Sequence, residues 1–323
     1  MSVLRPRTVR STGDDTPATT LRRYIWRMSE WHQLALAAIA LATAALAAVP
    51  LQLQQRIVDD AIRPGDTSLL IKLLVIYAAA ILLQQTLKVM LRLYQSWVGH
   101  SAVAYSRSHF ASLQNGRSDG GEHNGENVAV LTAEIEKLGR YAGFGPSDAL
   151  VSVATIIVLI GYMAFVEPMI VLLCLPFLVA QFVTVPLFQR KLDTLIERRI
   201  GAVRRLAERS TPQDTSGAHP DAKPARAIQH IYSVSLLLEI WKVLMKATIN
   251  TVGALGPLAV LAVGGWLAIR GDTTVGVVVA FMTGFMRLAD PARDVVQQVR
   301  QAAQARVQHQ MVATALNAAT SKS

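Results

Sequence analysis

The sequence predicts an all-α membrane protein with six transmembrane helices that continue as long helices beyond the membrane. The first observation is composition: 52% of the 323 residues are hydrophobic and only 17% are charged. The second is a set of apolar runs of about twenty residues, the length that crosses a hydrocarbon core about 30 Å thick. The third is a strong asymmetry of Lys and Arg between these runs. The core of a soluble protein does not need apolar runs of this length, so the three observations together predict a membrane protein.

Six apolar runs define the predicted spans, at residues 34–53, 69–91, 149–166, 169–188, 249–269 and 275–290. Only Glu167-Pro168 separates the third run from the fourth, and Arg270-Gly271-Asp272 separates the fifth from the sixth. Each run must be helical, because lipid offers no hydrogen-bond partner to the backbone. Residues 21–316 are therefore expected to form one transmembrane domain, between a flexible basic N-terminus (1–20) and a short tail (317–323).

The distribution of basic residues orients the spans. Arg-rich residues 1–33, the two long connections at 92–148 and 189–246, and the C-terminal tail all lie on one side. The other side receives only Arg56, Arg63 and Arg270. By the positive-inside rule, both termini and both long connections are cytoplasmic. An Ala- and Arg-rich composition is typical of bacteria with GC-rich genomes, so we expect a multi-pass protein of a bacterial inner or plasma membrane.

The two long connections have helical rather than linker character. Apolar residues recur three or four positions apart at Val128, Leu131, Ile135 and Leu138, and again from Leu192 to Val203. The membrane helices are therefore predicted to continue into the cytoplasm and to turn at residues 115–121 and 210–217, which are rich in Gly, Ser, Asn, Asp and Pro. Before the first span, residues 21–31 mix arginines with tyrosine and tryptophan, which predicts a helix lying in the membrane interface.

Several short segments carry a family resemblance. Pro50 to Ile62 reads PLQLQQRIVDDAI, Gly125-Glu126 is followed by LTAEIEKL at 131–138, and Gly256-Pro257 precedes Gly264-Gly265-Trp266-Leu267 and Thr274-Val275-Gly276. Leu288 to Arg293 reads LADPAR. In this order and spacing, the segments resemble the transmembrane domain of a type-1 ABC exporter across nearly the whole chain.

This resemblance implies a dimer of two six-helix chains, homomeric or heteromeric, whose cytoplasmic turns dock on ABC ATPase domains. ATP-driven closure of those domains would switch the helices between inward-facing and outward-facing states. Matching positions in the two turns imply a coupling surface to the ATPase. Its expected residues are Asp119, Gly120, Gly121, Glu122, Glu126, Glu208, Arg209, Gln213 and Asp214.

The sequence contains no Gly-Lys pair, so it lacks the P-loop that would hold ATP phosphates, and it lacks a Leu-Ser-Gly-Gly-Gln signature. We therefore expect no enzymatic activity and no cofactor on this chain, with ATP-Mg bound by a separate ATPase subunit. The second turn contains Pro212, Pro220 and Pro224 where the family is mostly helical, and proline disfavours a helix interior. The alternative is therefore a degenerate, non-transporting paralogue that acts as a membrane interaction or regulatory protein.

Polar residues within the spans are the candidates for a substrate path, because they are costly in lipid unless they face a cavity or a partner. These candidates are Gln84, Gln85, Lys88, Gln181, Asn250, Thr283 and Arg287. Hydrogen bonding between helices is the competing explanation for each, and Arg287 could pair with Asp290 three residues along its helix.

Other classes of function find no support in the sequence. The net charge of +10 is explained by the basic cytoplasmic segments, and no stacking or groove-reading motif accompanies it, so no nucleic-acid partner is expected. The seven histidines have no zinc-site spacing, and no cluster of catalytic residue types occurs at a span end. We therefore predict no catalytic and no metal-binding residue, and we name the lipid bilayer, a second transmembrane subunit and an ATPase as partners.

Overall fold

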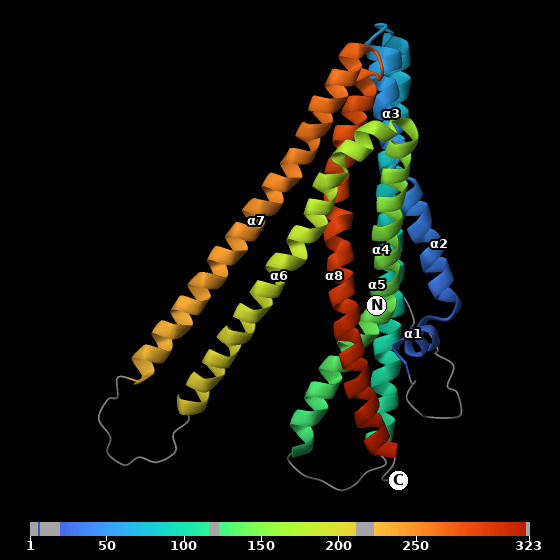
Figure 1. The fold of residues 1–323 in the computed structure, drawn as a ribbon. Coiled ribbons are helices and arrows are strands. Elements are labelled where there is room, and N and C mark those ends of the chain that lie inside the picture. Colours follow the sequence, from blue (N-terminus) through green and yellow to red (C-terminus); the bar gives the residue numbers. More distant parts are fainter. Residues whose placement is uncertain (1–5, 7–19, 116–122, 211–222, 321–323) are drawn as a thin grey trace.

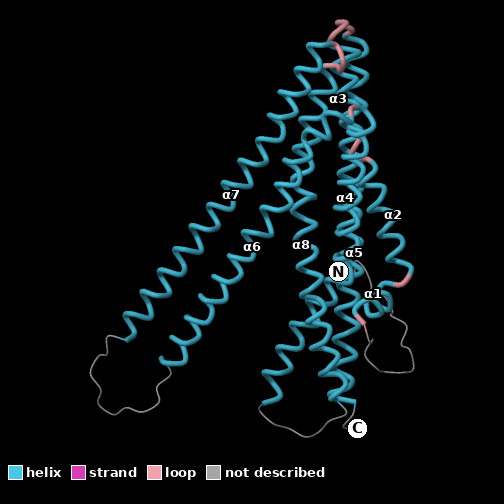
Figure 2. The backbone as a smooth tube through the Cα atoms, viewed as in Figure 1, coloured by secondary structure: helices cyan, strands magenta, loops and turns pink. Residues whose placement is uncertain are grey.

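Long helices account for nearly all of the computed structural model, which describes residues 6, 20–115, 123–210 and 223–320 (Figure 1). No strand occurs in these ranges (Figure 2). The helices are α1 (Leu21–Ser29), α2 (Trp31–Ala45), α3 (Val49–Arg56), the π-helix η1 (Ile57–Ile62), α4 (Thr67–Asn115), α5 (His123–Val166), α6 (Pro168–Ser210), α7 (Lys223–Arg270) and α8 (Val275–Thr320). This confirms the predicted all-α fold.

Five stretches of the described helices are long and apolar enough to cross a membrane: Trp31–Ile62, Thr67–His109, Ala133–Val166, Ile228–Arg270 and Val275–Thr314. They contain five of the six predicted spans. The remaining predicted span, residues 169–188, lies in α6, where five side chains fall outside the described set. Both long connections continue the membrane helices, as expected, up to Asn115 and Ser210.

Three details differ from expectation. The first span is not continuous, because a turn separates α2 from α3 and Pro50 stands in the first turn of α3, where its missing N–H costs no helical hydrogen bond. Pro224 does not interrupt a helix but likewise begins one, in the first turn of α7. The last helix also continues to Thr320, beyond the expected domain end at residue 316.

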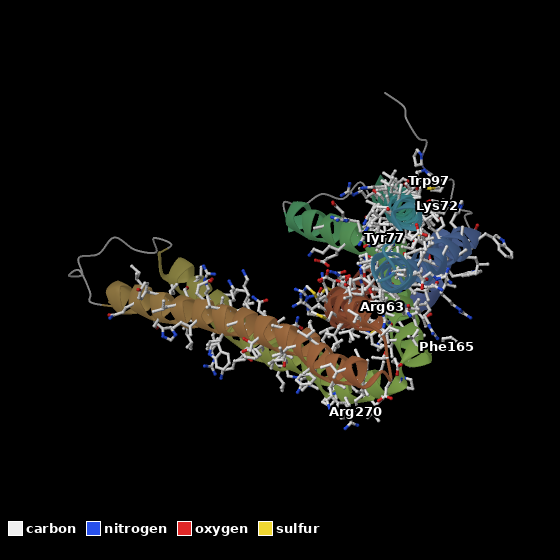
Figure 3. All side chains as sticks on the ribbon, turned by 90° about the horizontal axis from the view of Figure 1, so that it is seen from above. Arg63, Lys72, Tyr77, Trp97, Phe165 and Arg270 are labelled. Atoms are coloured by element: carbon white, nitrogen blue, oxygen red, sulfur yellow. The ribbon has the colours of Figure 1, made fainter. Side chains whose placement is uncertain are left out.

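The helices form two groups that meet at one end of the molecule. We call this the short-turn end, because it carries the connections around Gly65, Glu167 and Gly271; the opposite end is the long-loop end. Helices α2, α4, α5 and α8 run together as a bundle, whereas α6 and α7 pack against each other and diverge from the bundle toward the long-loop end (Figures 1 and 2). Viewed from above the short-turn end, the α6–α7 pair extends away to one side (Figure 3).

The main hydrophobic core explains why the two groups join at the short-turn end. Its fully buried members come from α3, α5, α6, α7 and α8, and include Leu51, Leu159, Ile170, Val260 and Phe281. Beyond this core, α6 and α7 rely on a small cluster of their own, formed by Leu192, Leu195 and Leu238. The pair is therefore anchored at the short-turn end and diverges from the bundle toward the long-loop end, with the Asp193 carboxylate of α6 still 3.9 Å from the Arg300 guanidinium of α8.

Glycines let α4 and α5 approach closely. A Cβ atom on Gly143 would lie 2.4 Å from the backbone oxygen of Gln95 and 2.6 Å from the backbone nitrogen of Gly99. One turn earlier on α5, a Cβ on Gly139 would lie 2.9 Å from the backbone nitrogen of Val103. Small residues four apart are a common way to bring two membrane helices into backbone contact.

A carboxylate from the first span holds the start of the last one. Asp59, in η1, accepts hydrogen bonds from the Thr274 hydroxyl at 2.5 Å and from the Gly276 backbone N–H at 2.9 Å. Thr274 directly precedes α8, and its hydroxyl also accepts from the Val277 N–H at 3.3 Å, whereas Gly276 belongs to the first turn of α8, whose N–H groups have no partner within the helix. Asp59 therefore caps α8 and joins segments more than 200 residues apart.

Helix α1 packs against the bundle, and its position agrees with the prediction that residues 21–31 form a helix in the membrane interface. It is seen almost end-on in Figure 1, so it lies across the direction of the long helices. One face is buried, with Tyr24 and Met28 in a cluster with residues of α4, α5 and α8. Burial raises the pKa of Tyr24 to about 12, with a hydrogen bond to the Ser106 hydroxyl acting in the opposite direction. The phenol therefore stays neutral at physiological pH.

Candidate functional site

A cavity of about 540 Å³ lies between α4, α5 and α8, on the long-loop side of the main core. Helix α5 contributes one wall, with Lys137, Arg140, Tyr141, Phe144 and Asp148, and α8 contributes the other. Gly139 and Gly143 set one face of α5 tightly against α4. Helix α5 also packs against α8, and the cavity lies on that side.

A hydrogen-bonded network joins α4 to α5 at the edge of this cavity. The fully buried Gln95 amide donates to the Ser147 hydroxyl at 2.8 Å and to the Asp148 carboxylate at 2.7 Å. The other carboxylate oxygen of Asp148 accepts from Arg92 at 2.8 Å. Both oxygens of Asp148 are therefore used, so this carboxylate is held in place on the cavity wall.

A row of glutamines forms the α8 wall. Gln297, Gln301, Gln304 and Gln308 recur every three or four residues and all line the cavity. Each amide can both donate and accept hydrogen bonds without carrying a charge. This wall was not among the sequence candidates, although the repeated glutamines at helical spacing were a visible signal.

Aromatic and charged groups complete the lining. The Arg92 guanidinium lies over the Phe144 ring, 5.9 Å from its centroid, and Tyr141 stands one turn before Phe144. Arg92, Lys137 and Arg140 line the cavity together with the carboxylates of Asp148 and Asp294, so its walls carry charges of both signs. Such a lining suits an amphipathic organic molecule, because aromatic faces bury its apolar part and the amides satisfy varied polar groups.

We expect Gln95→Met to lower the free energy of unfolding by about 1–3 kcal/mol, because Ser147 and Asp148 each lose a buried donor. Gln85→Met is the matched control, since Gln85 is an exposed glutamine on the same helix. The measurement is thermal unfolding of the purified protein in detergent. Equal stability of the two variants would contradict a structural role for this network.

The predicted substrate-path residues do not gather in this cavity. Asn250 lines a second cleft of about 510 Å³ between α6, α7 and α8, together with Thr184, Met286 and Arg293. Gln84 is buried, whereas Gln85 and Lys88 are exposed on α4, and none of the three lines either space.

The two α8 candidates lie close to the second cleft in sequence without lining it. The Thr283 hydroxyl donates to the Val279 backbone oxygen of its own helix at 3.1 Å. The suggested pairing of Arg287 with Asp290 is wrong, because Asp290 pairs with Arg293 instead. The Gln181 side chain lies outside the described residues.

The predicted coupling surface also lies outside the described side chains. Asp119, Gly120, Gly121, Glu122, Gln213 and Asp214 belong to the two undescribed loops. Glu126, Glu208 and Arg209 lie within helices, but their side chains are not described. The assignment of these residues to an ATPase contact stays a prediction.

Comparison with known proteins agrees with this architecture. Residues 34–208, more than half of the chain, match the ABC transporter transmembrane region. A Bacillus subtilis (strain 168) protein named as a multidrug export ATP-binding/permease protein, YgaD, is 24% identical over 265 residues, covering 76% of this chain and 45% of that protein. Multidrug efflux ATP-binding/permease proteins of Mycobacterium bovis and Mycobacterium tuberculosis are 37% identical over 84 residues, covering 26% of this chain and 7% of theirs. The chain thus spans less than half the length of these relatives.

Proposed function

Because this chain belongs to the family of ABC transporter transmembrane regions, we propose that it is the membrane-spanning subunit of an ABC-type exporter, powered by ATP hydrolysis on a separate nucleotide-binding subunit. It forms half of a substrate path and binds no nucleotide itself. ATP-Mg belongs to the partner subunit, which docks on the two long loops.

The cavity between α4, α5 and α8 is the observation that carries this proposal. It combines aromatic rings, charges of both signs and a row of neutral amides in about 540 Å³. This chemistry accepts many amphipathic molecules rather than one, which agrees with the multidrug export named in the relatives. We propose amphipathic organic compounds as the substrate class.

The exposed surface of α6 and α7 supports a second transmembrane subunit. In their long-loop halves, beyond the predicted spans, Ile196, Ile200, Tyr232 and Leu236 are 40–66% exposed. Large apolar side chains outside the lipid are costly unless another protein covers them. A second copy, or a related chain, covers them in the proposed dimer. The dimer lies in a bacterial inner or plasma membrane with both termini in the cytoplasm.

Affinity isolation of the chain from gently solubilised native membranes tests the partnership. We expect an ABC ATPase in about one-to-one ratio, and ATP-dependent accumulation of an amphipathic dye in inverted vesicles that contain both proteins. The double variant Gln301→Leu/Gln304→Leu should reduce dye transport several-fold, because it removes polar groups from the cavity wall. Gln310→Leu, an exposed glutamine of the same helix that does not line the cavity, is the control. Recovery of the chain without any ATPase would favour the non-transporting paralogue.

A further inference from the structure

A third cavity, of about 570 Å³, lies between α1, α5 and α8. Tyr141, Gly145 and Gln298 line both this space and the proposed substrate cavity, so they form a shared wall between the two. The remaining lining differs in character. It is mainly apolar, with Ile25, Val153 and Val299 among its members.

The position of α1 places this cavity at the level of the lipid headgroups. The helix exposes Trp26, and Trp31 follows at the start of α2; these side chains are 52% and 76% exposed. Exposed tryptophans beside arginines are typical of helices at the boundary between hydrocarbon and water. The cavity thus lies where a lipid molecule has both its headgroup and the start of its acyl chains.

Two buried acceptors point to a ligand that donates hydrogen bonds. The side-chain oxygens of Gln33 and Gln298 are buried and accept no hydrogen bond from any described residue, and both glutamines line this cavity. An unsatisfied buried polar atom costs about 1–3 kcal/mol, so a bound N–H or O–H group at these oxygens would be stabilising.

Two cations point to a ligand that also carries an anionic group. Arg22 of α1 and Arg306 of α8 line the cavity, and neither forms an ion pair within the described part of the chain. Guanidinium groups bind phosphate oxygens in paired hydrogen bonds. The site thus presents anion binders, hydrogen-bond acceptors and an apolar wall within one space.

We propose that this cavity binds one phospholipid whose headgroup carries hydrogen-bond donors, such as phosphatidylethanolamine or phosphatidylglycerol. Arg22 and Arg306 hold the phosphate, the headgroup N–H or O–H donates to Gln33 and Gln298, and an acyl chain packs on the apolar wall. A helix about 10–12 Å across fills roughly 500 Å³ per turn. A space of about 570 Å³ therefore holds only about one turn of a partner helix, whereas it admits a headgroup and part of a narrow acyl chain. This site does not depend on the proposed transport function.

Native mass spectrometry of the full-length protein, delipidated in detergent and titrated with single lipids, tests the proposal. We expect one lipid to bind at least tenfold more tightly when it is phosphatidylethanolamine than when it is phosphatidylcholine. The two lipids share the phosphate and differ in that the choline nitrogen has no N–H. Gln298→Leu should remove this preference while leaving phosphatidylcholine binding unchanged. Equal binding of both lipids by the unmodified protein would overturn the role given to the glutamines.

Arg22→Ala/Arg306→Ala should weaken binding of either lipid at least tenfold. Arg23→Ala/Arg300→Ala is the control, because it removes one arginine from α1 and one from α8 without touching the cavity lining, and it breaks only the exposed 3.9 Å ion pair between Arg300 and Asp193. Thermal unfolding without lipid checks that all variants are folded. Equal loss in both double variants would mean a general charge effect and would refute the site. Displacement of the lipid by inorganic phosphate alone would assign the site to a free anion instead.

Discussion

Replacing Gly143 with alanine should destabilise the protein more than any other single methyl group placed on α5. The new Cβ would lie 2.4 Å and 2.6 Å from backbone atoms of Gln95 and Gly99, and backbone atoms cannot rotate away as a flexible side chain can. Overpacking costs about 1–3 kcal/mol where side chains can adjust. A backbone clash requires the two helices to separate, so we expect a loss at or above the upper end of this range.

Gly161→Ala is the control for this variant. Gly161 lies on the same helix, and a Cβ there would meet nothing within 4 Å. Because alanine favours a helix interior over glycine by about 1 kcal/mol, Gly161→Ala should leave stability unchanged or raise it. The stability of both variants is measured by heating the protein in detergent and recording the fraction that stays monodisperse on size exclusion. A Gly143→Ala protein as stable as the control would show that α4 and α5 do not pack at backbone contact.

Asp59→Ala should have the second large effect, because it removes both hydrogen bonds that hold the start of α8. Hydrogen bonds to a charged group contribute about 1.5–3 kcal/mol each. We expect a loss of about 2–4 kcal/mol for the pair, since Asp59 is only partly buried and water can replace one of its contacts. Asp59→Asn should lower the free energy of unfolding by less than Asp59→Ala does, because the asparagine amide keeps one oxygen as a hydrogen-bond acceptor.

Asp60→Ala provides the comparison for Asp59. Asp60 is the adjacent carboxylate in η1, is exposed, and has no hydrogen bond or ion pair with a described residue. Its replacement should change stability by no more than about 0.5 kcal/mol. If both alanine variants unfold at the same temperature, the capping of α8 by Asp59 contributes nothing, and the last span is held by apolar packing alone.

The spans were predictable because hydropathy and the spacing of apolar residues are local properties. The same is true of the helical extensions, whose apolar spacing continued past the predicted membrane boundaries at Ile135 and Leu195. The turn before α3 was not predictable from composition, since the surrounding residues are an almost unbroken run of Ala and Leu. Only Pro50 marked it, and proline is common in continuous membrane helices too.

The candidate site was harder to predict than the fold. Polar residues were sought inside the apolar runs, where Gln84, Gln85 and Lys88 stand out, but most of the residues that line the cavity lie just beyond those runs. Its walls depend on which faces of α5 and α8 meet, and these segments are about 150 residues apart in sequence. The contact between Asp59 and the start of α8 is equally non-local. No pattern in a single sequence records such a pairing.

The capping of α8 by Asp59 also sets an order of events during biosynthesis. Chains are made from the N-terminus at about 5–20 residues per second, so η1 emerges at least ten seconds before Thr274 and Gly276 exist. Throughout that time the first span can be in the membrane, yet its carboxylate lacks its final partners. The residues at the start of the last span thus supply the hydrogen-bond donors for Asp59 of the first span. In a nascent chain that stops before residue 274, Asp59 lacks these donors. Such an unfinished chain therefore differs from the complete one at a defined site, the carboxylate of Asp59.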